Sequence, residues 1–366
     1  MQVMARCRSQ GITASVQDIM QSKSITDLTT RVKVTKSLAS APVNETKTVE
    51  NGKPFRLSPI QQVYLDNAGD NWRQFNQSVL LKVTKRKSND VISRAMDQLI
   101  SLHPMLHARF QRNKNGEWRQ HISSDLKGSL RLRTHSDARC GQMGSLIEQS
   151  QKALDIENGP LVAVDIFSLP GSETQMSIAI HHLVIDVVSW RIVLQDLEDL
   201  LNGASVTRQD LTFQSWCELQ IQNAQEDSVK RVIPATTVPP ADLTYWGMAG
   251  KSNTFGEVLT EEFELEQSTT TRILDACQRQ IGADLIDVLL ATILLSFRQE
   301  FTNRRVPPAV FNEGHGREPW DSSCDPSSIV GWFTTMSPVY LPADADTDSS
   351  KFWYHLVCLS RRLYWL

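Results

Sequence analysis

The chain is 366 residues long, carries a formal net charge of −3 at pH 7 and has 40% hydrophobic residues. That length allows two or three domains, or one two-lobed unit. So small a charge gives no reason to expect nucleic acid or an anionic membrane as a partner. The six cysteines are scattered without a CxxC pair, so they indicate neither a zinc site nor a disulfide framework, but reduced thiols in a cytoplasmic protein.

No segment of the sequence is predicted to cross a membrane. The most apolar stretch, residues 285–297, contains Asp287 and is shorter than the roughly 20 residues that span a bilayer. We expect a buried helix there. The first ten residues lack the apolar centre of a signal peptide.

The first 54 residues are predicted to contain short helices followed by a linker. Residues 1–33 indicate two short helical segments, the first ending at Gly11, with Ser15 and Ser24 as candidate N-caps after it. So short a segment cannot bury much of a core alone. Residues 34–54 have no steady period and are predicted to form a linker.

Strands and helices alternate in the next part of the chain. The elements expected there are a strand over 76–84, a helix over 90–102, and strand pairs over 107–112 with 117–121 and 161–169 with 175–181. Asn115-Gly116 and Pro170-Gly171 are the turn signals of the two pairs. Ser189 is predicted to cap a helix that Gly203 ends.

A polar stretch with prolines, residues 223–242, is the predicted crossing between two lobes. The second lobe is expected to contain strands over 259–265, 308–312 and 331–342 and helices over 268–281 and 284–301. Mixed strands and helices in both halves predict an α/β or α+β fold.

Two adjacent histidines stand at the end of the apolar strand over 175–181, and an aspartate comes after them, before the helix. These are His181, His182 and Asp186. A histidine at a strand end is held firmly yet can face a cavity, and its pKa near neutrality suits proton transfer. His181 points to the other face of the strand, so we interpret it as structural.

Five segments in order carry a family resemblance. Residues 57–62 (LSPIQQ), 181–191 (HHLVIDVVSWR), 287–291 (DVLLA), 312–318 (NEGHGRE) and 330–335 (VGWFTT) resemble the successive motifs of epimerization domains of nonribosomal peptide synthetases, within the condensation-domain superfamily. Residues 75–78 (FNQS) come after the first motif as that resemblance implies. The NEGHGRE and VGWFT segments favour epimerization over peptide-bond formation.

The resemblance implies a fold and a site. The fold would be the two-lobed chloramphenicol-acetyltransferase-like fold, with lobes over 55–225 and 240–366 and the second lobe incomplete. His182 and Glu313 would be the catalytic acid/base pair, because inversion of a stereocentre needs proton transfer at both of its faces. We predict that they face one another across a cleft between the lobes.

Other residues of the motifs are predicted to support this pair. Asp186 is expected to orient its loop through an ion pair with Arg191 or another arginine, and Trp332 to belong to the core. The supporting set is His181, Asp186, Ser189, Arg191, His315, Arg317 and Trp332. A metal site built from the histidines is disfavoured, because adjacent strand residues diverge.

The sequence departs from the family pattern in two places. Val187 replaces the glycine that comes after the aspartate in HHxxxDG, and valine resists backbone geometries that glycine permits. The last two family motifs, one of them with an active-site tyrosine, are not found before Leu366, which predicts a C-terminally truncated domain. Residues 1–33 resemble the last helices of a peptidyl carrier domain without its phosphopantetheine serine.

The implied activity is epimerization of an L-aminoacyl or L-peptidyl thioester. The substrate would be tethered to the phosphopantetheine of a carrier domain, and the partners would be that domain and other synthetase modules. No directly bound cofactor is expected, because neither a phosphate cradle nor a pyridoxal lysine motif is recognisable. The alternatives are a condensation domain that forms peptide bonds, and an inactive fragment that only docks carrier domains.

Overall fold

A computed structural model describes residues 12–13, 22, 24–34, 51–69, 72–85, 87–136, 140–169, 173–206, 211–225, 238, 242–251, 259–277, 285–301, 308–317 and 325–340. The chain divides into two compact units. One comprises Met1–Glu218 with Arg317–Trp332, and the other Leu219–Gly316 with Phe333–Leu366. The segment Arg317–Trp332, which lies within the predicted second lobe, therefore groups with the first unit. The predicted helix over 2–10, most of the linker and most of the crossing at 223–242 lie outside the described residues.

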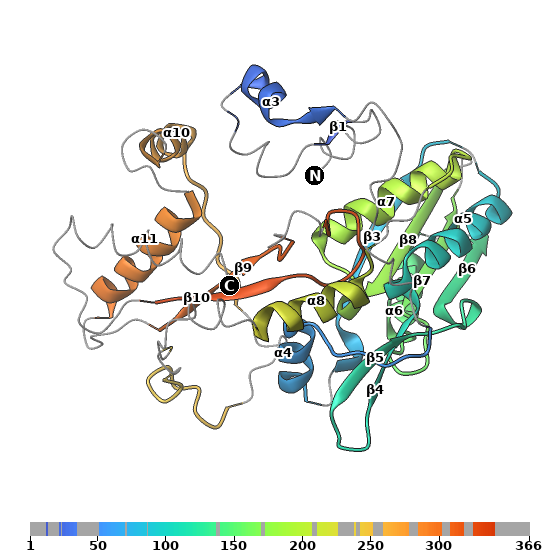
Figure 1. Cartoon of the computed structure of the whole chain (residues 1–366), viewed down its shortest axis with the longest axis horizontal. Coiled ribbons are helices and arrows are strands. Elements are labelled where there is room, and N and C mark those ends of the chain that lie inside the picture. Colours follow the sequence, from blue (N-terminus) through green and yellow to red (C-terminus); the bar gives the residue numbers. More distant parts are fainter. Residues whose placement is uncertain are drawn as a thin grey trace. The chain divides into compact units, whose positions relative to one another are not determined.

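A four-stranded sheet forms the centre of the first unit (Figure 1). Its strand order is β3 (Asn76–Val83), β8 (Thr174–His181), β7 (Val162–Ser168) and β6 (Leu130–Ser136). β8 runs antiparallel to both neighbours, and β6 is parallel to β7. β7 is buried along most of its length, as expected for a strand whose two faces are both covered. The predicted strands over 76–84, 161–169 and 175–181 are confirmed.

Helices pack on this sheet. α5 (Asn89–Leu102) and α7 (Val187–Leu201) lie side by side (Figure 1), and α6 (Cys140–Lys152) packs on β7 and β8. The predicted helix over 90–102 is confirmed, and its apolar stripe of Ile92, Met96 and Leu99 is fully buried. α5 ends one residue before His103 and the 3-10 turn η2 (Pro104–His107) comes next, because proline cannot continue the helix.

Further short elements are described in the first unit. The predicted hairpin is confirmed as β4 (Ala108–Arg112) paired with β5 (Trp118–Ile122), and Gly116 has φ +80° in its turn. α4 (Pro59–Asn67) begins with a capping box of Ser58 and Gln61. Among the described residues, the unit also contains β1 (Ile12–Thr13), α3 (Ile25–Arg31), β2 (Lys33–Val34), η1 (Trp72–Gln74), η3 (Lys127–Ser129), η5 (His182–Val184) and α8 (Phe213–Gln225), the last continuing into the second unit.

The N-terminal region differs in part from its prediction. Ser24 caps α3 by accepting a hydrogen bond from the Asp27 amide, as predicted. Residues 12–13 and 33–34, however, form a short antiparallel pair that the sequence did not indicate. A two-residue strand is too short for the alternation of polar and apolar residues that reveals strands in a sequence.

The second unit is described over α10 (Gln267–Ala276), α11 (Leu285–Glu300), β9 (Val310–Gly314) and β10 (Thr335–Val339). β9 and β10 pair antiparallel. Leu290, Ala291 and Leu294 of α11 pack with Val339 of β10 in a small core. The predicted helix over 284–301 and strand over 331–342 are confirmed in part of their ranges.

The prediction of a strand over 259–265 is wrong. These residues have no regular structure, and Leu259 and Phe263 are 95% and 88% exposed. Alternating apolar residues favour a strand only when a partner strand and a covered face are available. Neither can be inferred from the local sequence.

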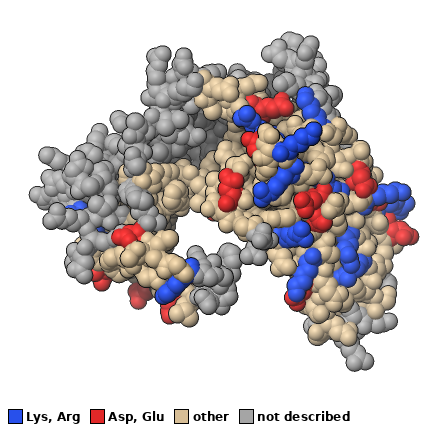
Figure 2. All heavy atoms as spheres, turned by 90° about the horizontal axis from the view of Figure 1, so that it is seen from below, with Lys and Arg blue, Asp and Glu red and all other residues tan. Residues whose placement is uncertain are grey.

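Charged side chains are interspersed on the face drawn in Figure 2, with acidic groups lying between the basic ones. The described residues of that face therefore carry a mixture of both charges and no large patch of one sign, in keeping with the net charge of −3. No helix in the described part of the chain is both long and apolar enough to cross a membrane.

Candidate active site

The His182 loop connects β8 to α7 and is held from both sides. The His182 amide donates to the Phe75 carbonyl at 2.7 Å, which continues the β3–β8 pairing by one residue. The Gln61 side chain on α4 donates to the Leu183 carbonyl at 2.7 Å. The LSPIQQ motif therefore positions the loop of the HHxxxD motif through a buried amide.

Aromatic rings fix the plane of the His182 imidazole. Phe75 stacks on it with ring centroids 4.6 Å apart and an interplanar angle of 5°. The Trp332 ring lies 4.5 Å from it at 47°, and Tyr64 stacks on the far side of Phe75 at 4.3 Å. Burial raises the pKa of the Tyr64 hydroxyl to about 12.

His182 is also held at its Nε2 atom. That atom lies 2.7 Å from Nε2 of Gln77 on β3, and Oε1 of the same glutamine accepts a hydrogen bond of 2.8 Å from the Trp190 indole on α7. The partly buried His182 ring is thus connected to both the sheet and the following helix.

His181 occupies a different environment from its neighbour. It is 0% exposed, its Nε2 lies 3.0 Å from the Trp72 carbonyl, and its Nδ1 accepts from the Leu183 amide at 3.3 Å. Burial lowers the pKa of His181 to about 4. His181 is thus a neutral ring with a backbone partner at each nitrogen, which agrees with its interpretation as a structural residue.

Asp186 is the N-cap of α7 and one half of a buried ion pair. Its Oδ1 accepts from the Ser189 amide at 2.6 Å and from Nη2 of Arg317 at 3.0 Å. The two side chains are only 7% and 1% exposed. Burial lowers the pKa of the Arg317 guanidinium while Asp186 opposes that shift. The arginine of NEGHGRE therefore anchors the aspartate of HHxxxD.

One prediction about this network is wrong. Ser189 does not cap α7, because Asp186 lies at the cap position and Ser189 is already inside the first turn. The Ser189 hydroxyl instead donates to the Gly331 carbonyl at 2.8 Å and accepts from Arg317 at 2.8 Å. The predicted ion pair of Asp186 is confirmed: of the two possibilities left open, Arg191 or another arginine, the partner is Arg317, and Arg191 is exposed.

The VGWFT segment joins the same network at Gly331 and Trp332. A Cβ on Gly331 would lie 2.2 Å from the Phe213 ring, so only glycine fits there. Ser58 donates to the Trp332 carbonyl at 3.3 Å, and Trp332 is buried at 4% exposure. This agrees with the expectation that Trp332 is a core residue, yet one of its ring contacts is His182.

Glu313 belongs to the second unit and lies on β9. It pairs with Met336 of β10, and its side chain is exposed, as is His315 just beyond the strand. Gly316 has φ +64°, and a Cβ there would lie 1.7 Å from the Phe333 carbonyl, so this turn requires glycine. That Glu313 and His182 face one another stays a prediction.

Reasoning from the sequence did not assign roles to two residues that contact the His182 side chain, Phe75 and Gln77, or to Trp190, which binds Gln77. Phe75, Gln77 and Trp190 lie within or beside segments that were predicted to be a strand or a helix. The FNQS pattern next to a paired strand was the available signal, but only the observed register, with Gln77 opposite Ile180, brings Gln77 near the end of β8. Among the described residues, no group of three or more His, Cys, Asp or Glu side chains could hold a metal ion.

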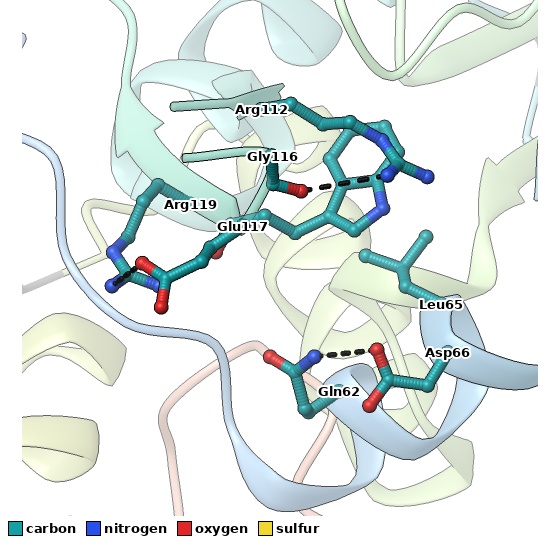
Figure 3. A pocket seen from close by; sticks show the side chains of 8 residues that line it. Gln62, Leu65, Asp66, Arg112, Gly116, Glu117 and Arg119 are labelled. Atoms are coloured by element: carbon teal, nitrogen blue, oxygen red, sulfur yellow. Dashed lines mark hydrogen bonds and ion pairs between the residues drawn. The ribbon is translucent and has the colours of Figure 1, made fainter. Parts of the chain in front are cut away.

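A polar pocket lies away from these residues, between α4 and the β4–β5 hairpin (Figure 3). Its polar side chains already bind one another: Gln62 donates to Asp66 at 2.7 Å, and Arg119 binds Glu117 at 2.7 Å. It is lined by Gln62, Leu65, Asp66, Arg112, Gly116, Glu117, Trp118 and Arg119. We assign it no role in the chemistry.

The fold and the motif network define a class of protein. The structure is similar to that of the epimerization domain from the third module of tyrocidine synthetase B, with a TM-score of 0.66 and 22% identity over 87% of this chain and 75% of that one. The X-domain from teicoplanin biosynthesis is similar with a TM-score of 0.65 and 16% identity, over 88% and 73%. The chain thus has the chloramphenicol-acetyltransferase-like fold of condensation and epimerization domains.

Comparison of sequences identifies the family. The condensation-domain family matches residues 53–356. Nonribosomal peptide synthetase 1 of Aspergillus fumigatus is 40% identical over 95% of this chain, and nonribosomal peptide synthetase 4 of Gibberella zeae is 39% identical over 94%. The chain spans only 6% and 4% of these relatives. It belongs to the condensation-domain family of nonribosomal peptide synthetases, whose members act on carrier-tethered substrates.

Proposed function

We propose that this domain epimerizes an L-aminoacyl or L-peptidyl residue held as a thioester on the phosphopantetheine of a carrier domain. The observation that carries the proposal is the NEGHGRE segment. It presents an exposed carboxylate at Glu313, while its Arg317 is bonded to the aspartate of the histidine motif. That sequence is typical of epimerization domains rather than of domains that form peptide bonds.

The proposed reaction is two proton transfers. His182 removes the α-proton of the residue, and the electron pair of the broken C–H bond delocalises onto the thioester oxygen as an enolate. Glu313, in its protonated form, returns a proton to the opposite face of the α-carbon. The roles exchange for the reverse direction, so that a mixture of L and D residues results. Two positioned acid/base groups suffice for this chemistry.

The support of the His182 ring suits its proposed role. The His182 ring is held by Phe75, Trp332 and Gln77, which limits the orientations of its lone pair. Pre-positioned groups lower the barrier because orientation is fixed before reaction. The partner of the reaction is a carrier domain bearing the substrate, as in the multidomain synthetases of the family.

Deuterium exchange tests the proposal. The protein is mixed in D₂O with a phosphopantetheinylated carrier domain loaded with each of a panel of L-amino acids. The amino acid is then released and analysed for deuterium and chirality. We expect α-deuterium and D isomer with at least one substrate. The same mixtures are also given a second carrier that bears a free amine.

The outcomes separate the candidate functions. An amide product without α-exchange would establish condensation and refute the proposal. Neither product, with the carrier domain bound, would also refute it in favour of a domain that only docks carriers. Exchange without amide formation supports the proposal.

A further inference from the structure

The amide of Gln77 lies between the Trp190 indole and the His182 ring, with hydrogen bonds of 2.8 Å and 2.7 Å. We propose that Gln77, oriented by Trp190, is a positioning residue that holds the proton of neutral His182 on Nδ1 and leaves the lone pair on Nε2. The effect of Gln77 on catalysis rests on the proposed function, whereas the assignment of the His182 proton to Nδ1 does not.

The first step of the argument concerns Trp190. An indole N–H can donate but cannot accept a hydrogen bond. Trp190 is 8% exposed, and leaving a buried donor without a partner is costly. The oxygen of the Gln77 amide therefore has to face Trp190, and the two ends of the amide are not interchangeable at this position.

The second step depends on the first. With Oε1 facing Trp190, the Gln77 group next to His182 is the NH₂ group, which can only donate. Nε2 of His182 lies 2.7 Å from it and has to accept. An imidazole with an accepting Nε2 carries its proton on Nδ1 when it is neutral.

The adjacent histidine provides an internal contrast. Nε2 of His181 lies 3.0 Å from the Trp72 carbonyl, which can only accept, so this nitrogen donates. Its Nδ1 accepts from the Leu183 amide. The two neighbouring histidines are therefore held as opposite tautomers, each by a partner with a single possible role.

This arrangement has a chemical consequence. A histidine removes a proton through its unprotonated nitrogen, and here that atom is Nε2. The Gln77 amide has to give up its hydrogen bond when the substrate α-carbon approaches, while the stacked Phe75 and Trp332 rings keep the imidazole plane in place. Gln77 thus acts through His182 and not on the substrate.

The decisive variant is Gln77→Glu. A carboxylate has nearly the same shape and still accepts from Trp190, but it cannot donate to His182. Nε2 of His182 then has to donate, which moves the proton to Nε2 or protonates both nitrogens. ¹⁵N NMR of histidine-labelled protein reads the tautomer, and the His182 signals are those missing from His182→Ala.

We expect Nδ1–H in the wild type, and Nε2–H or the doubly protonated ring in Gln77→Glu. The rate of α-deuterium exchange should fall about 10²-fold, as for loss of a general base. The matched control is Gln111→Glu on β4, where the exposed side chain undergoes the same change. It should leave both the His182 tautomer and the exchange rate unchanged.

A second variant guards against misfolding of the first. Trp190→Phe keeps an aromatic ring and removes the donor, so the Gln77 amide can rotate and both tautomers of His182 should appear. The assignment would be overturned if His182 of the wild-type protein carried its proton on Nε2, or if neither variant altered the tautomer. A switched tautomer with an unchanged exchange rate would overturn its catalytic role. If the wild type shows Nδ1–H but exchanges no proton with any substrate, the proposed function fails while the tautomer assignment stands.

Discussion

The segments around His182 and Glu313 contrast in how the protein supports them. His182 has a stacked ring, a bonded Nε2 and a loop held by buried side chains from α4 and the Arg317–Trp332 segment. Glu313 extends from an exposed face of a two-stranded sheet. Substitutions near His182 should therefore affect folding and chemistry together, whereas those at Glu313 should affect chemistry alone.

The largest effect is expected for His182→Ala. Loss of a positioned acid/base group lowers rates by about 10²–10⁴-fold, and α-deuterium exchange should fall by that factor. The partly buried His121 on β5 offers a control, because His121→Ala removes a histidine from the same unit without touching the loop. Exchange within about threefold of the wild type in His182→Ala would remove this residue from the mechanism.

Arg317→Met tests the support of the loop. It leaves the Asp186 carboxylate buried without its cation, and breaking a buried pair in this way costs about 3–5 kcal/mol. Urea unfolding should show this loss. Arg191→Met makes the same change at the exposed arginine and should stay within about 0.5 kcal/mol. Equal effects of the two substitutions would contradict the importance of the buried pair.

Acid should destabilise the protein through His181. Its pKa is about 4 in the folded protein and near 6.5 when exposed. Between these values the unfolded chain binds the proton more readily, so stability is lost as the pH falls from about 6.5 to 4, by up to about 3 kcal/mol. Comparison of the unfolding free energy at both pH values should show a smaller loss in His181→Gln. Equal losses would assign the acid sensitivity to other groups.

Glu313→Gln should separate chemistry from folding. It keeps the side-chain shape and removes the titrating carboxylate, so exchange should fall about 10²-fold. Because Glu313 is exposed, the unfolding free energy should change by no more than about 0.5 kcal/mol. Glu300→Gln at the end of α11 is the matched control for an exposed glutamate. A large loss of stability in Glu313→Gln would end the contrast drawn between the two segments.

The smallest effect is expected for Val187→Gly. Val187 is the first residue of α7, is 66% exposed and lies just after the Asp186 cap. Glycine would lower helix stability by about 0.5–1 kcal/mol and restore the residue of the family motif. Exchange should be equal or higher. A clear drop in exchange would show that the valine itself has a role in this domain.

The sequence predicted local elements well where periodicity is strong. The apolar stripe of α5, the Asn115-Gly116 turn and the pairing of β7 with β8 all depend on neighbouring residues, and all are confirmed. These elements indicated the α/β class of the fold, and the ordered motifs indicated the family.

The contacts of the site could not be predicted in the same way. Ser189 is preceded by an aspartate three positions earlier, and either residue type can be an N-cap; the structure places Asp186 there. Arg191 is near Asp186 in sequence, yet the ion pair is made with Arg317. Distant pairings of this kind depend on the tertiary fold, which local patterns do not encode.

Arg317–Trp332 belongs to the first unit although it is synthesised after most of the second, and this affects the order of events during translation. Asp186 leaves the ribosome 131 residues before the arginine that neutralises it. At about 5–20 residues per second this interval is about 7–26 s. During it the nascent first unit contains a carboxylate at the start of α7 without its cation and a Phe213 ring that is not yet covered by Gly331. The vectorial emergence of the chain therefore delays completion of the first unit until most of the second has been synthesised.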